Sequence, residues 1–477
     1  MGFFDRFRKN KRGYDAGARG RNNANWRVSV QSAESEDRFD RSTVRARARD
    51  MERNSDLLNS NTAAFRRNVI GRGFTLRPHT GNKELDAQLF DLWKRWCKAR
   101  NCDLTAQQNL TEMLRMIVER KKIDGGILIH KVYTAGGVVP LCLQILEVDE
   151  LDEAAMTPEN SENRVVGGIE YDRYRRPQYF HIRQYAIDGY TEMKSIAIPA
   201  KDIIFYYTKR RPSQIREMSD MAPVLTRIRD ANELITAASV RARIVACSGI
   251  AIKRVQNVLG GIGRNQNRSE ADGEKVSYKG KTITPGMILE MNPGEEVDPI
   301  DPKGGSEDAS GMLRMLQRQI GAALGLSYEA SSRDMSQSNY SSARQGLIED
   351  NETYAEEIDR IIEILDEIYE SFVISAVLSD ALTIPDFWDH KERYFAHDWA
   401  RAPKPWIDPL KEANANRIAV QSGQKTFQQI AAENGHDWKE MIDDMAEVVN
   451  YARDNGLEIG GVIYGKERVY PKETAEG

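Results

Sequence analysis

The sequence predicts an α+β fold in which a mixed body of helices and strands precedes a series of long helices. Apolar residues recur at helical spacing over residues 83–100, 105–120 and 221–247. Between residues 124 and 208, short runs rich in β-branched and aromatic residues alternate with turn residues, a pattern typical of strands. Because the connections between these runs are short, we expect the strands to pair mostly antiparallel.

The N-terminal region begins with a basic segment and continues as a helix. Residues 1–27 contain eight Lys or Arg against two acids, which favours a mobile arm. Such an arm is equally compatible with a solubilising tail and with a contact to nucleic acid or a partner. Residues 36–70 are predicted to be helical with an arginine-rich face formed by Arg45, Arg47, Arg49 and Arg53.

Two helices enclose a small module in the second half of the chain. The helix over 221–247 has Pro223 in its first turn, and a second helix is expected at 307–325. Between them, the runs GIAIKRV and ITPGMILEM read as strands around a loop at 256–283. Residues 249–285 carry seven Lys or Arg and three acids, which gives a local charge of 7 − 3 = +4.

A third long helix is predicted at about 341–379. It contains ten Asp or Glu and a single arginine, Arg360, between Glu349 and Glu370. We interpret this as a helix with one apolar face in the core and one acidic face exposed. Residues from 408 onward return to helical spacing.

Overall composition excludes several classes of protein. The chain has 477 residues, a net charge of −4 and a pI near 6.0, so a surface that grips DNA throughout is excluded. Its four cysteines form no CxxC pair and are expected to be reduced thiols. The N-terminus lacks the apolar region of a signal peptide, and no apolar run is long enough to span a membrane.

No motif for catalysis or cofactor binding is present. The sequence contains no GxxxxGK[ST], HExxH or GxSxG, and its six histidines are scattered. Glu352, Glu356 and Asp359 share one face of the predicted acidic helix, where a solvated surface is a far commoner role than a metal site. We therefore predict no catalytic residue, no cofactor and no metal.

A polar segment, SRDMSQSNYSSAR at residues 332–344, interrupts two strongly helical regions and contains no Val, Ile or Leu. It belongs to a longer stretch, IGAALGLSYEASSRDMSQSNYSSARQGLIE at 320–349. Together with RRPSQIREMSDMAPVL at 210–225 and WIDPLKEANA at 406–415, this stretch resembles the phage portal proteins of the lambda-like family. The resemblance extends from about residue 40 to 457. The sequence departs from the family pattern at two positions, where Ser213 and Glu217 stand in place of glycines, so a different local turn is expected there.

The resemblance implies a phage portal fold that assembles as a ring. Its parts would be an α+β wing, a helical stem, a small clip and a helical crown. The implied boundaries are a flexible basic arm at 1–27, the first part of the wing at 28–220, stem helices at 221–247 and 306–326 around a clip at 248–305, a tunnel loop at 327–341, a long tunnel helix with the completion of the wing at 342–405, and a crown and tail at 406–477.

The resemblance also implies a role and a location. Portal proteins form a ring, usually of twelve copies, at one capsid vertex, through which double-stranded DNA is packaged and ejected. The implied partners are other copies of the chain, DNA, the terminase large subunit, a head-completion or adaptor protein, and the major capsid protein with its scaffold, but no membrane. The protein would assemble in the host bacterial cytoplasm and remain in the virion.

Three groups of residues are expected to serve this role. The first is the DNA-facing part of the tunnel loop, formed by Arg333, Gln337, Ser338 and Asn339. The second is a basic group in the clip, for DNA or for motor and adaptor docking, formed by Lys253, Arg254, Arg264 and Arg268. The third comprises Tyr340, Ser341 and Arg344, expected as a subunit contact, a helix cap and an ion-pair partner on a neighbouring helix.

Alternatives remain open for the loop and for the whole chain. Asp334, Asn339 and Ser341 could all cap the helix that begins near residue 342, and capping and DNA contact are equally compatible with Asn339. A metal-dependent enzyme acting on DNA would use the acidic helix, although no His or Lys partner completes such a site. A capsid scaffold or adaptor without a DNA channel is the third hypothesis.

Overall fold

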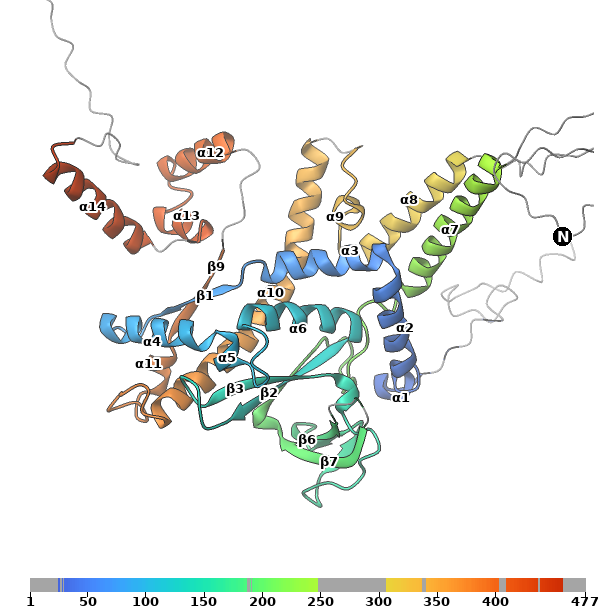
Figure 1. Ribbon diagram of the computed structural model, residues 1–477, viewed down its shortest axis with the longest axis horizontal. Coiled ribbons are helices and arrows are strands. Elements are labelled where there is room, and N and C mark those ends of the chain that lie inside the picture. Colours follow the sequence, from blue (N-terminus) through green and yellow to red (C-terminus); the bar gives the residue numbers. More distant parts are fainter. Residues whose placement is uncertain are drawn as a thin grey trace, which may run out of the picture.

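The computed structural model describes residues 25, 28, 30–186, 189, 191–247, 306–336, 340–402, 409–435 and 438–457. The body combines helices with three small antiparallel sheets, of which the one containing β6 and β7 lies at its lower edge, and a helical hairpin projects from one side (Figure 1). A separate group of three helices lies above the opposite side of the body (Figure 1). The predicted α+β class is confirmed. The predicted strands of the clip lie outside the described residues.

The predicted N-terminal helix is divided into four pieces. Ser55 has an extended conformation, and its hydroxyl accepts a hydrogen bond from the backbone N–H of Leu58, so it caps a new helix and ends the preceding one. The last piece is a π-helical turn, in which the chain widens by one residue before Gly71. The pieces are α1 (Ala33–Asp37), α2 (Arg41–Asn54), α3 (Asp56–Phe65) and η4 (Arg66–Ile70).

Capping residues also set the bounds of the next helices. Asp103 accepts hydrogen bonds from the backbone N–H groups of Gln107 and Gln108, which keeps this segment out of the helix predicted at 105–120. Asn109 and Glu112 form a capping box at the true start of that helix. The helices are α4 (Lys83–Trp96), α5 (Ala99–Cys102) and α6 (Leu110–Asp124).

Every strand pairing among the described residues is antiparallel, as predicted. The strand orders are β3-β2-β8, β4-β5-β6-β7 and β1-β9. The last pair joins the N-terminal body to a segment beyond the long helix. The strands are β1 (Phe74–Pro78), β2 (Gly126–Tyr133), β3 (Leu141–Leu146), β4 (Arg164–Val166), β5 (Ile169–Tyr171), β6 (Pro177–Tyr185), β7 (Thr191–Pro199), β8 (Ile203–Tyr207) and β9 (His397–Arg401).

The long helices agree closely with the prediction. Helices α7 and α8 form the projecting antiparallel hairpin. The upper end of α10 is free, and the helix runs from there down into the body (Figure 1). Helix α7 begins four residues later than expected, after Pro223. The elements are α7 (Leu225–Cys247), α8 (Ser306–Ala323), α9 (Tyr328–Ser332), α10 (Tyr340–Leu378), α11 (Lys391–Phe395), α12 (Pro409–Gln421), α13 (Phe427–Glu433) and α14 (Trp438–Asp454), with 3-10 turns at η5 (Val148–Glu150) and η6 (Ala200–Asp202).

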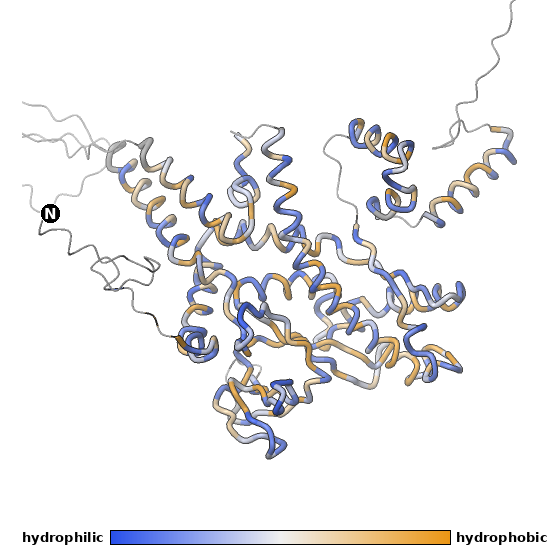
Figure 2. Tube along the Cα trace, turned by 180° about the vertical axis from the view of Figure 1, so that it is seen from behind, coloured by the Kyte–Doolittle hydropathy of each residue, from blue (hydrophilic) through white to orange (hydrophobic). Residues whose placement is uncertain are grey.

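The main hydrophobic core lies where α10 crosses α4, α6 and the sheets. Phe372 of α10 is fully buried, and its ring centroid lies 5.0 Å from that of Trp93 and 5.4 Å from that of Trp96. Apolar residues accordingly concentrate inside the body, whereas polar residues cover its periphery (Figure 2). The lower half of α10 is therefore fixed, while its upper end stands clear of the body (Figure 1).

The segment before α7 is held by buried charges. Glu217, which is fully buried, accepts hydrogen bonds from Arg45 Nη1 at 2.9 Å and from Arg216 Nε at 2.8 Å. Although burial opposes ionisation, the guanidinium groups of Arg216, Arg41 and Arg45 keep the pKa of Glu217 below its ordinary value. The arginine-rich face predicted for the N-terminal helix thus binds this segment rather than facing solvent throughout.

Ser213 and Glu217, the two residues that stand where the family pattern has glycines, both contact the N-terminal helices. Ser213 Oγ accepts a hydrogen bond from the backbone N–H of Ala33 at 3.0 Å, and Glu217 binds Arg45 of α2. A serine and a glutamate at these positions therefore supply contacts that glycines cannot. The local backbone is also crowded, because a Cβ on Gly125 would lie 2.3 Å from the carbonyl carbon of Met218.

We predict that Glu217→Ala lowers the free energy of unfolding by about 3–5 kcal/mol, because it leaves buried arginines without their carboxylate. Chemical denaturation measures this loss. Glu153→Ala is the matched control, because the Glu153 side chain is 50% exposed and lies 3.3 Å from Arg216. Its cost should stay below about 1 kcal/mol. Equal losses in the two variants would contradict the role given to burial.

Candidate nucleic-acid interface

The predicted tunnel loop is partly helical. Residues 328–332 form α9, whose first turn is capped by the Ser327 hydroxyl, so the expectation of an irregular loop over 327–341 is wrong in its first half. Asp350 of α10 accepts hydrogen bonds from the backbone N–H of Ser327 at 2.6 Å and from its hydroxyl at 2.7 Å. Asp350 therefore ties the base of the loop to the long helix.

Helix α9 is seated against α3, α8 and α10. Ser60 of α3 donates a hydrogen bond to the carbonyl of Ser331 at 2.9 Å, and the Arg318 guanidinium lies 5.3 Å from the ring centroid of Tyr328. The turn before α9 requires glycine, since Gly325 has a φ of +72° and a Cβ there would lie 2.7 Å from Thr353 Oγ1. These contacts fix the position from which the rest of the loop departs.

Arg333 ends α9 with its side chain exposed. Its backbone is left-handed, with φ 58° and ψ 18°, and its N–H donates to the carbonyl of Glu329. Asp334 then accepts hydrogen bonds from the Ser336 N–H at 3.0 Å and the Tyr328 hydroxyl at 3.2 Å. Asp334 therefore holds this turn rather than capping α10. Gln337, Ser338 and Asn339 lie outside the described residues.

At the start of α10, the predicted cap at Ser341 is wrong and the predicted ion pair of Arg344 is not supported. The helix begins at Tyr340, so Ser341 lies inside its first turn instead of capping it from outside. The preceding position is Asn339, which is not described, and neither is the side chain of Tyr340. Arg344 is exposed and forms no ion pair with any carboxylate that the structure describes.

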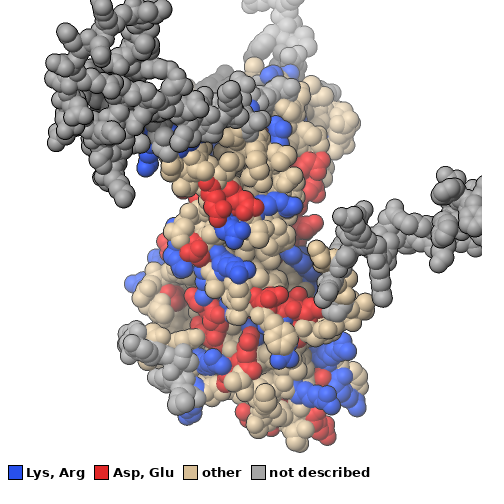
Figure 3. Space-filling model, turned by 90° about the vertical axis from the view of Figure 1, so that its right-hand side faces the viewer, with Lys and Arg blue, Asp and Glu red and all other residues tan. Residues whose placement is uncertain are grey.

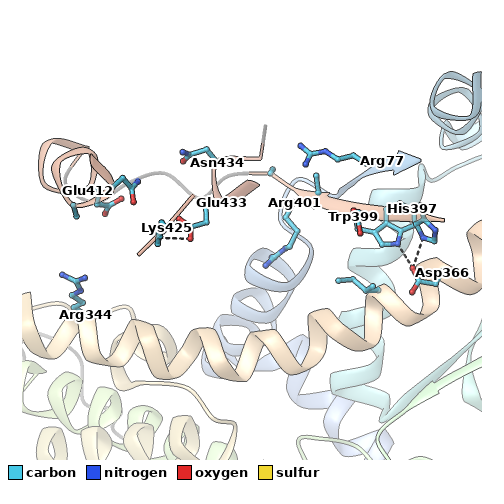
Figure 4. A pocket seen from close by; sticks show the side chains of 16 residues that line it. Arg77, Arg344, Asp366, His397, Trp399, Arg401, Glu412, Lys425, Glu433 and Asn434 are labelled. Carbon is cyan, nitrogen blue, oxygen red and sulfur yellow. Dashed lines mark hydrogen bonds and ion pairs between the residues drawn. The ribbon is translucent and has the colours of Figure 1, made fainter. Parts of the chain in front are cut away.

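Arg344 lines a cavity of about 1080 Å³ between α10, the β1–β9 pair and the C-terminal helices (Figure 4). Several other charged groups in this cavity are already paired. Lys425 binds Glu433 at 2.8 Å, and Asp366 accepts hydrogen bonds from His397 at 3.0 Å and the Trp399 indole at 2.7 Å. The cavity has mixed charge, and Arg344 extends into it from α10 (Figure 4).

A buried cluster of four charges joins α6, α10 and the segment before α7. Lys121 Nζ lies 2.9 Å from Asp220 and 2.5 Å from Glu357, and Lys122 Nζ lies 3.1 Å and 2.7 Å from the same carboxylates. The Tyr206 hydroxyl donates a further hydrogen bond to Glu357. Although burial opposes ionisation, the two lysines keep the pKa of Glu357 well below its ordinary value and also lower the pKa of Asp220.

The acidic residues of the long helix were predicted to form one exposed face, but only some of them are exposed. Glu357 is buried, Asp350 binds the loop base, and Asp366 and Glu367 contact residues of the sheets. Glu352, Glu356 and Asp359 are exposed. In the described part of the chain, no three His, Cys, Asp or Glu residues are grouped as metal ligands.

The predicted basic residues of the clip, Lys253, Arg254, Arg264 and Arg268, lie outside the described residues. Sequence reasoning also missed functional candidates within the described ranges. Arg67, in η4, is exposed and borders a cavity between this turn and α6. The conformation of the π-helical turn that carries Arg67 depends on hydrogen bonds from Arg115 and Arg401, which no local pattern reveals. None of the described helices is long and apolar enough to cross a membrane.

A family model and the similar proteins of known phages all point to the same family. Residues 19–357 match the family model described as phage portal protein, lambda family. The probable portal protein of Halomonas phage phiHAP-1 is 23% identical over 431 residues, which cover 88% of this chain and 82% of that protein. Portal protein B of Escherichia phage lambda is 25% identical over 195 residues, which cover 39% of this chain and 34% of the lambda protein.

The solved structures similar to this chain include particle necks. A chain from the neck of a native gene transfer agent particle, computed with C12 symmetry, has a TM-score of 0.36 and 13% sequence identity. The match covers 80% of this chain and 89% of that chain. A chain from the neck of the empty particle, computed with C6 symmetry, has the same TM-score and identity over 79% of this chain and 89% of that chain.

We predict that Glu357→Gln lowers the free energy of unfolding at pH 7 by about 3–5 kcal/mol, because it breaks the buried four-charge cluster. The folded pKa of Glu357 is depressed, so its contribution is complete above the unfolded value of about 4.3 and is lost as the pH falls toward the folded value. The difference from the unsubstituted chain should therefore shrink progressively below about pH 4.

Denaturation midpoints across this pH range measure the effect of Glu357→Gln. Glu352→Gln is the control, because it removes an exposed carboxylate from the same helix. It should leave stability unchanged within about 0.5 kcal/mol. A difference between Glu357→Gln and the unsubstituted chain that persists at low pH would rule out the ionised carboxylate as its source.

Proposed function

Because this chain belongs to the lambda family of phage portal proteins, we propose that it forms a ring-shaped DNA channel at one capsid vertex. Double-stranded DNA would be packaged and ejected through this channel without recognition of its sequence. The family match over residues 19–357 is the observation that carries the proposal. The ring is expected to contain twelve subunits, and the chain itself to be structural, without catalytic residues or a cofactor.

Exposed apolar residues on the projecting hairpin support assembly. Ile235 and Val240 of α7 are 49% and 47% exposed, and Met312 and Met315 of α8 are each 51% exposed. Leaving such residues in water forfeits hydrophobic stabilisation, which contact with a neighbouring subunit restores. In a ring, each hairpin would present one such face to each neighbour, because the contacts between identical subunits repeat around the axis.

The three C-terminal helices also leave large apolar residues exposed. In their described part, Ile430, Ala431 and Ala452 are the only buried hydrophobic residues. Five large apolar residues are at least 47% exposed, namely Leu410, Ile418, Ile442, Val448 and Tyr451. We propose that α12–α14 form the crown and gain their missing core from the crowns of adjacent subunits.

Weak and uniform contact with DNA suits a channel. The chain carries a net charge of −4, and on the face seen in Figure 3 acidic and basic side chains are interspersed. Each neutralised phosphate adds a salt-dependent attraction that a ring would multiply. Hydroxyl and amide groups in the tunnel loop would exchange hydrogen bonds with phosphates and water with a net free-energy change of only about 1 kcal/mol each.

The remaining partners follow from the proposed position at the vertex. Residues 248–305 would form the clip that docks the terminase large subunit during packaging and a head-completion or adaptor protein afterwards. Lys253, Arg254, Arg264 and Arg268 would supply its positive charge. The outer body would contact the major capsid protein and scaffold, and the ring would remain in the virion after assembly in the bacterial cytoplasm.

We predict that Ile235→Asp prevents ring assembly while the individual chain stays folded. Ile235 is half exposed in the single chain, so the charge would be desolvated only at a subunit contact. Negative-stain images and mass photometry report assembly, and circular dichroism reports folding. Ala237→Asp, two residues along α7 and so on the opposite face, is the control and should assemble. An unfolded Ile235→Asp chain would contradict this assignment.

We predict that Arg333→Ala leaves the ring intact but lowers the amount of DNA packaged or retained. Arg333 is exposed at the end of α9, so its side chain contributes little to folding. Packaging assays with purified rings and the cognate motor measure the effect. Arg333→Lys preserves the charge and should retain most of the activity. Loss of rings in Arg333→Ala would instead assign the residue to assembly.

A further inference from the structure

A positively charged turn connects β5 to β6 at one end of the four-stranded sheet. Its residues, 172–176, read DRYRR, and all except Asp172 are exposed. The turn has a charge of 3 − 1 = +2 on a chain whose net charge is −4. Its three arginines form no ion pair with any carboxylate that the structure describes. The β5–β6 turn is therefore a local basic patch that is open to a partner.

Asp172 fixes the backbone of the β5–β6 turn. Its Oδ1 accepts hydrogen bonds from the backbone N–H groups of Tyr174 and Arg176, each at 2.8 Å. The N–H of Arg175 donates to the carbonyl of Asp172 at 3.0 Å, and the N–H of Asp172 donates to the carbonyl of Arg176 at the same distance. The side chains of the turn are therefore presented by an ordered backbone.

Arg175 occupies a position that favours glycine. Its φ is +63°, in the left-handed region, where a Cβ is strained. Glycine is common at this position of a short strand connection, because it adopts the conformation without steric cost. Residues other than glycine in such a conformation are frequent at binding sites. The backbone therefore gains nothing from an arginine here, and a ligand is the element that would use its charge.

The Tyr174 ring positions two of the guanidinium groups. The guanidinium carbon of Arg173 lies 4.6 Å from the ring centroid of Tyr174, and that of Arg176 lies 5.6 Å from it. Both distances allow cation–π attraction. A guanidinium group over a ring keeps the N–H donors at its edge, where they can still bind an anion. The same groups cover ring surface on which a nucleic-acid base would otherwise stack.

The register of the sheet brings two more cations to this end. Arg164 of β4 is exposed and lies opposite Tyr171, the last residue before the turn. Lys201 is exposed and follows Pro199, the residue of β7 that pairs near the start of β6. Asp202 is next to Lys201, so the excess of positive charge at this end comes mainly from the turn itself.

The position of the sheet indicates which anion the turn meets. The sheet that contains β6 and β7 lies at the lower edge of the body, on the opposite side from α9 (Figure 1). In the proposed ring, the tunnel loop that follows α9 faces the channel. The β5–β6 turn then faces away from the DNA in the channel and toward proteins around the ring.

We infer that the β5–β6 turn is a docking site for an acidic protein segment, whose Asp or Glu carboxylates bind the guanidinium groups of Arg173, Arg175 and Arg176. Arginine and carboxylate groups frequently pair through two parallel hydrogen bonds, which adds geometric specificity to the attraction of opposite charges. The choice of an acidic segment over DNA rests on the proposed function, because it depends on where the channel lies.

Binding of a fluorescein-labelled octaglutamate peptide to the purified full-length chain, at about 50 mM salt to limit screening, tests the inference. A fluorescein-labelled DNA duplex is the second probe. Arg173→Ala, Arg175→Gly and Arg176→Ala should each weaken peptide binding about two- to fivefold, the range for one exposed charge pair, and affect the duplex less. Arg38→Ala is the matched control, because Arg38 is exposed and its guanidinium carbon lies 4.7 Å from the Phe39 ring centroid. It should bind the peptide like the unsubstituted chain.

Arg175→Gly separates binding from folding. Glycine removes the charge and accepts the left-handed conformation, so the thermal midpoint should stay unchanged or rise while peptide binding weakens. A lower midpoint would assign Arg175 to folding and overturn its role in binding.

Three other results would overturn the docking site. They are the absence of peptide binding by the unsubstituted chain, unchanged peptide binding by all three arginine variants, and a loss of duplex affinity that equals or exceeds the loss of peptide affinity. Failure of the unsubstituted chain to form rings would count against the proposed channel alone, because peptide binding at this turn does not require a ring.

Discussion

The arrangement of the long helix depends on the buried cluster of Lys121, Lys122, Asp220 and Glu357. Removing charges from water costs several kcal/mol for each ion, and only close pairing with further hydrogen bonds repays that cost. Each lysine here lies within 3.1 Å of both carboxylates. The cluster therefore tolerates little displacement of α6, α10 or the segment that leads into α7. The segment before α7, the long helix α10 and the body are thereby held in fixed relative positions. The aromatic core below the cluster packs around the same helix.

Much of the fold could be predicted because long helices and short antiparallel strands leave regular apolar spacing. Helix α10 was predicted to within a residue or two at either end, and strands were expected correctly between residues 124 and 208. The paired strands β1 and β9 lie outside the region predicted as strands. The breaks were not visible, because Ser55 ends a helix only by capping the next one and Asp103 delays α6 through bonds to two nearby N–H groups. The exposure of the acidic residues on α10 was predicted wrongly for a related reason. Periodicity places Glu357 on an acidic stripe, but its lysine partners lie far away in the sequence and bury it.

The candidate site was only half accessible to sequence reasoning. Arg333 stands out within a polar segment, and the structure places it, exposed, at the end of α9. Arg67 carries no such signal. It follows a helix of ordinary composition, and the π-helical turn that presents it is maintained by Arg115 and Arg401, which come from two other elements. Sites assembled from several elements depend on tertiary packing, so the residue types alone do not identify them.

Helix α10 is anchored unevenly along its length, and this gives it a graded stiffness. Below Asp350 it is held by the four-charge cluster, by Asp366 and by the aromatic core, whereas most residues between Ser341 and Glu349 are exposed. Gly346 lies in this stretch beside Ser327, and a Cβ there would come within 3.1 Å of the Ser327 Cβ. Glycine allows this close approach but also weakens the helix, since glycine gains the most conformational freedom when a helix unwinds. The helix is thus a rod fixed in the body, and its upper end is where it would unwind first. Each turn that unwinds would lengthen the adjoining loop, and Asp350 sets the limit of its reach.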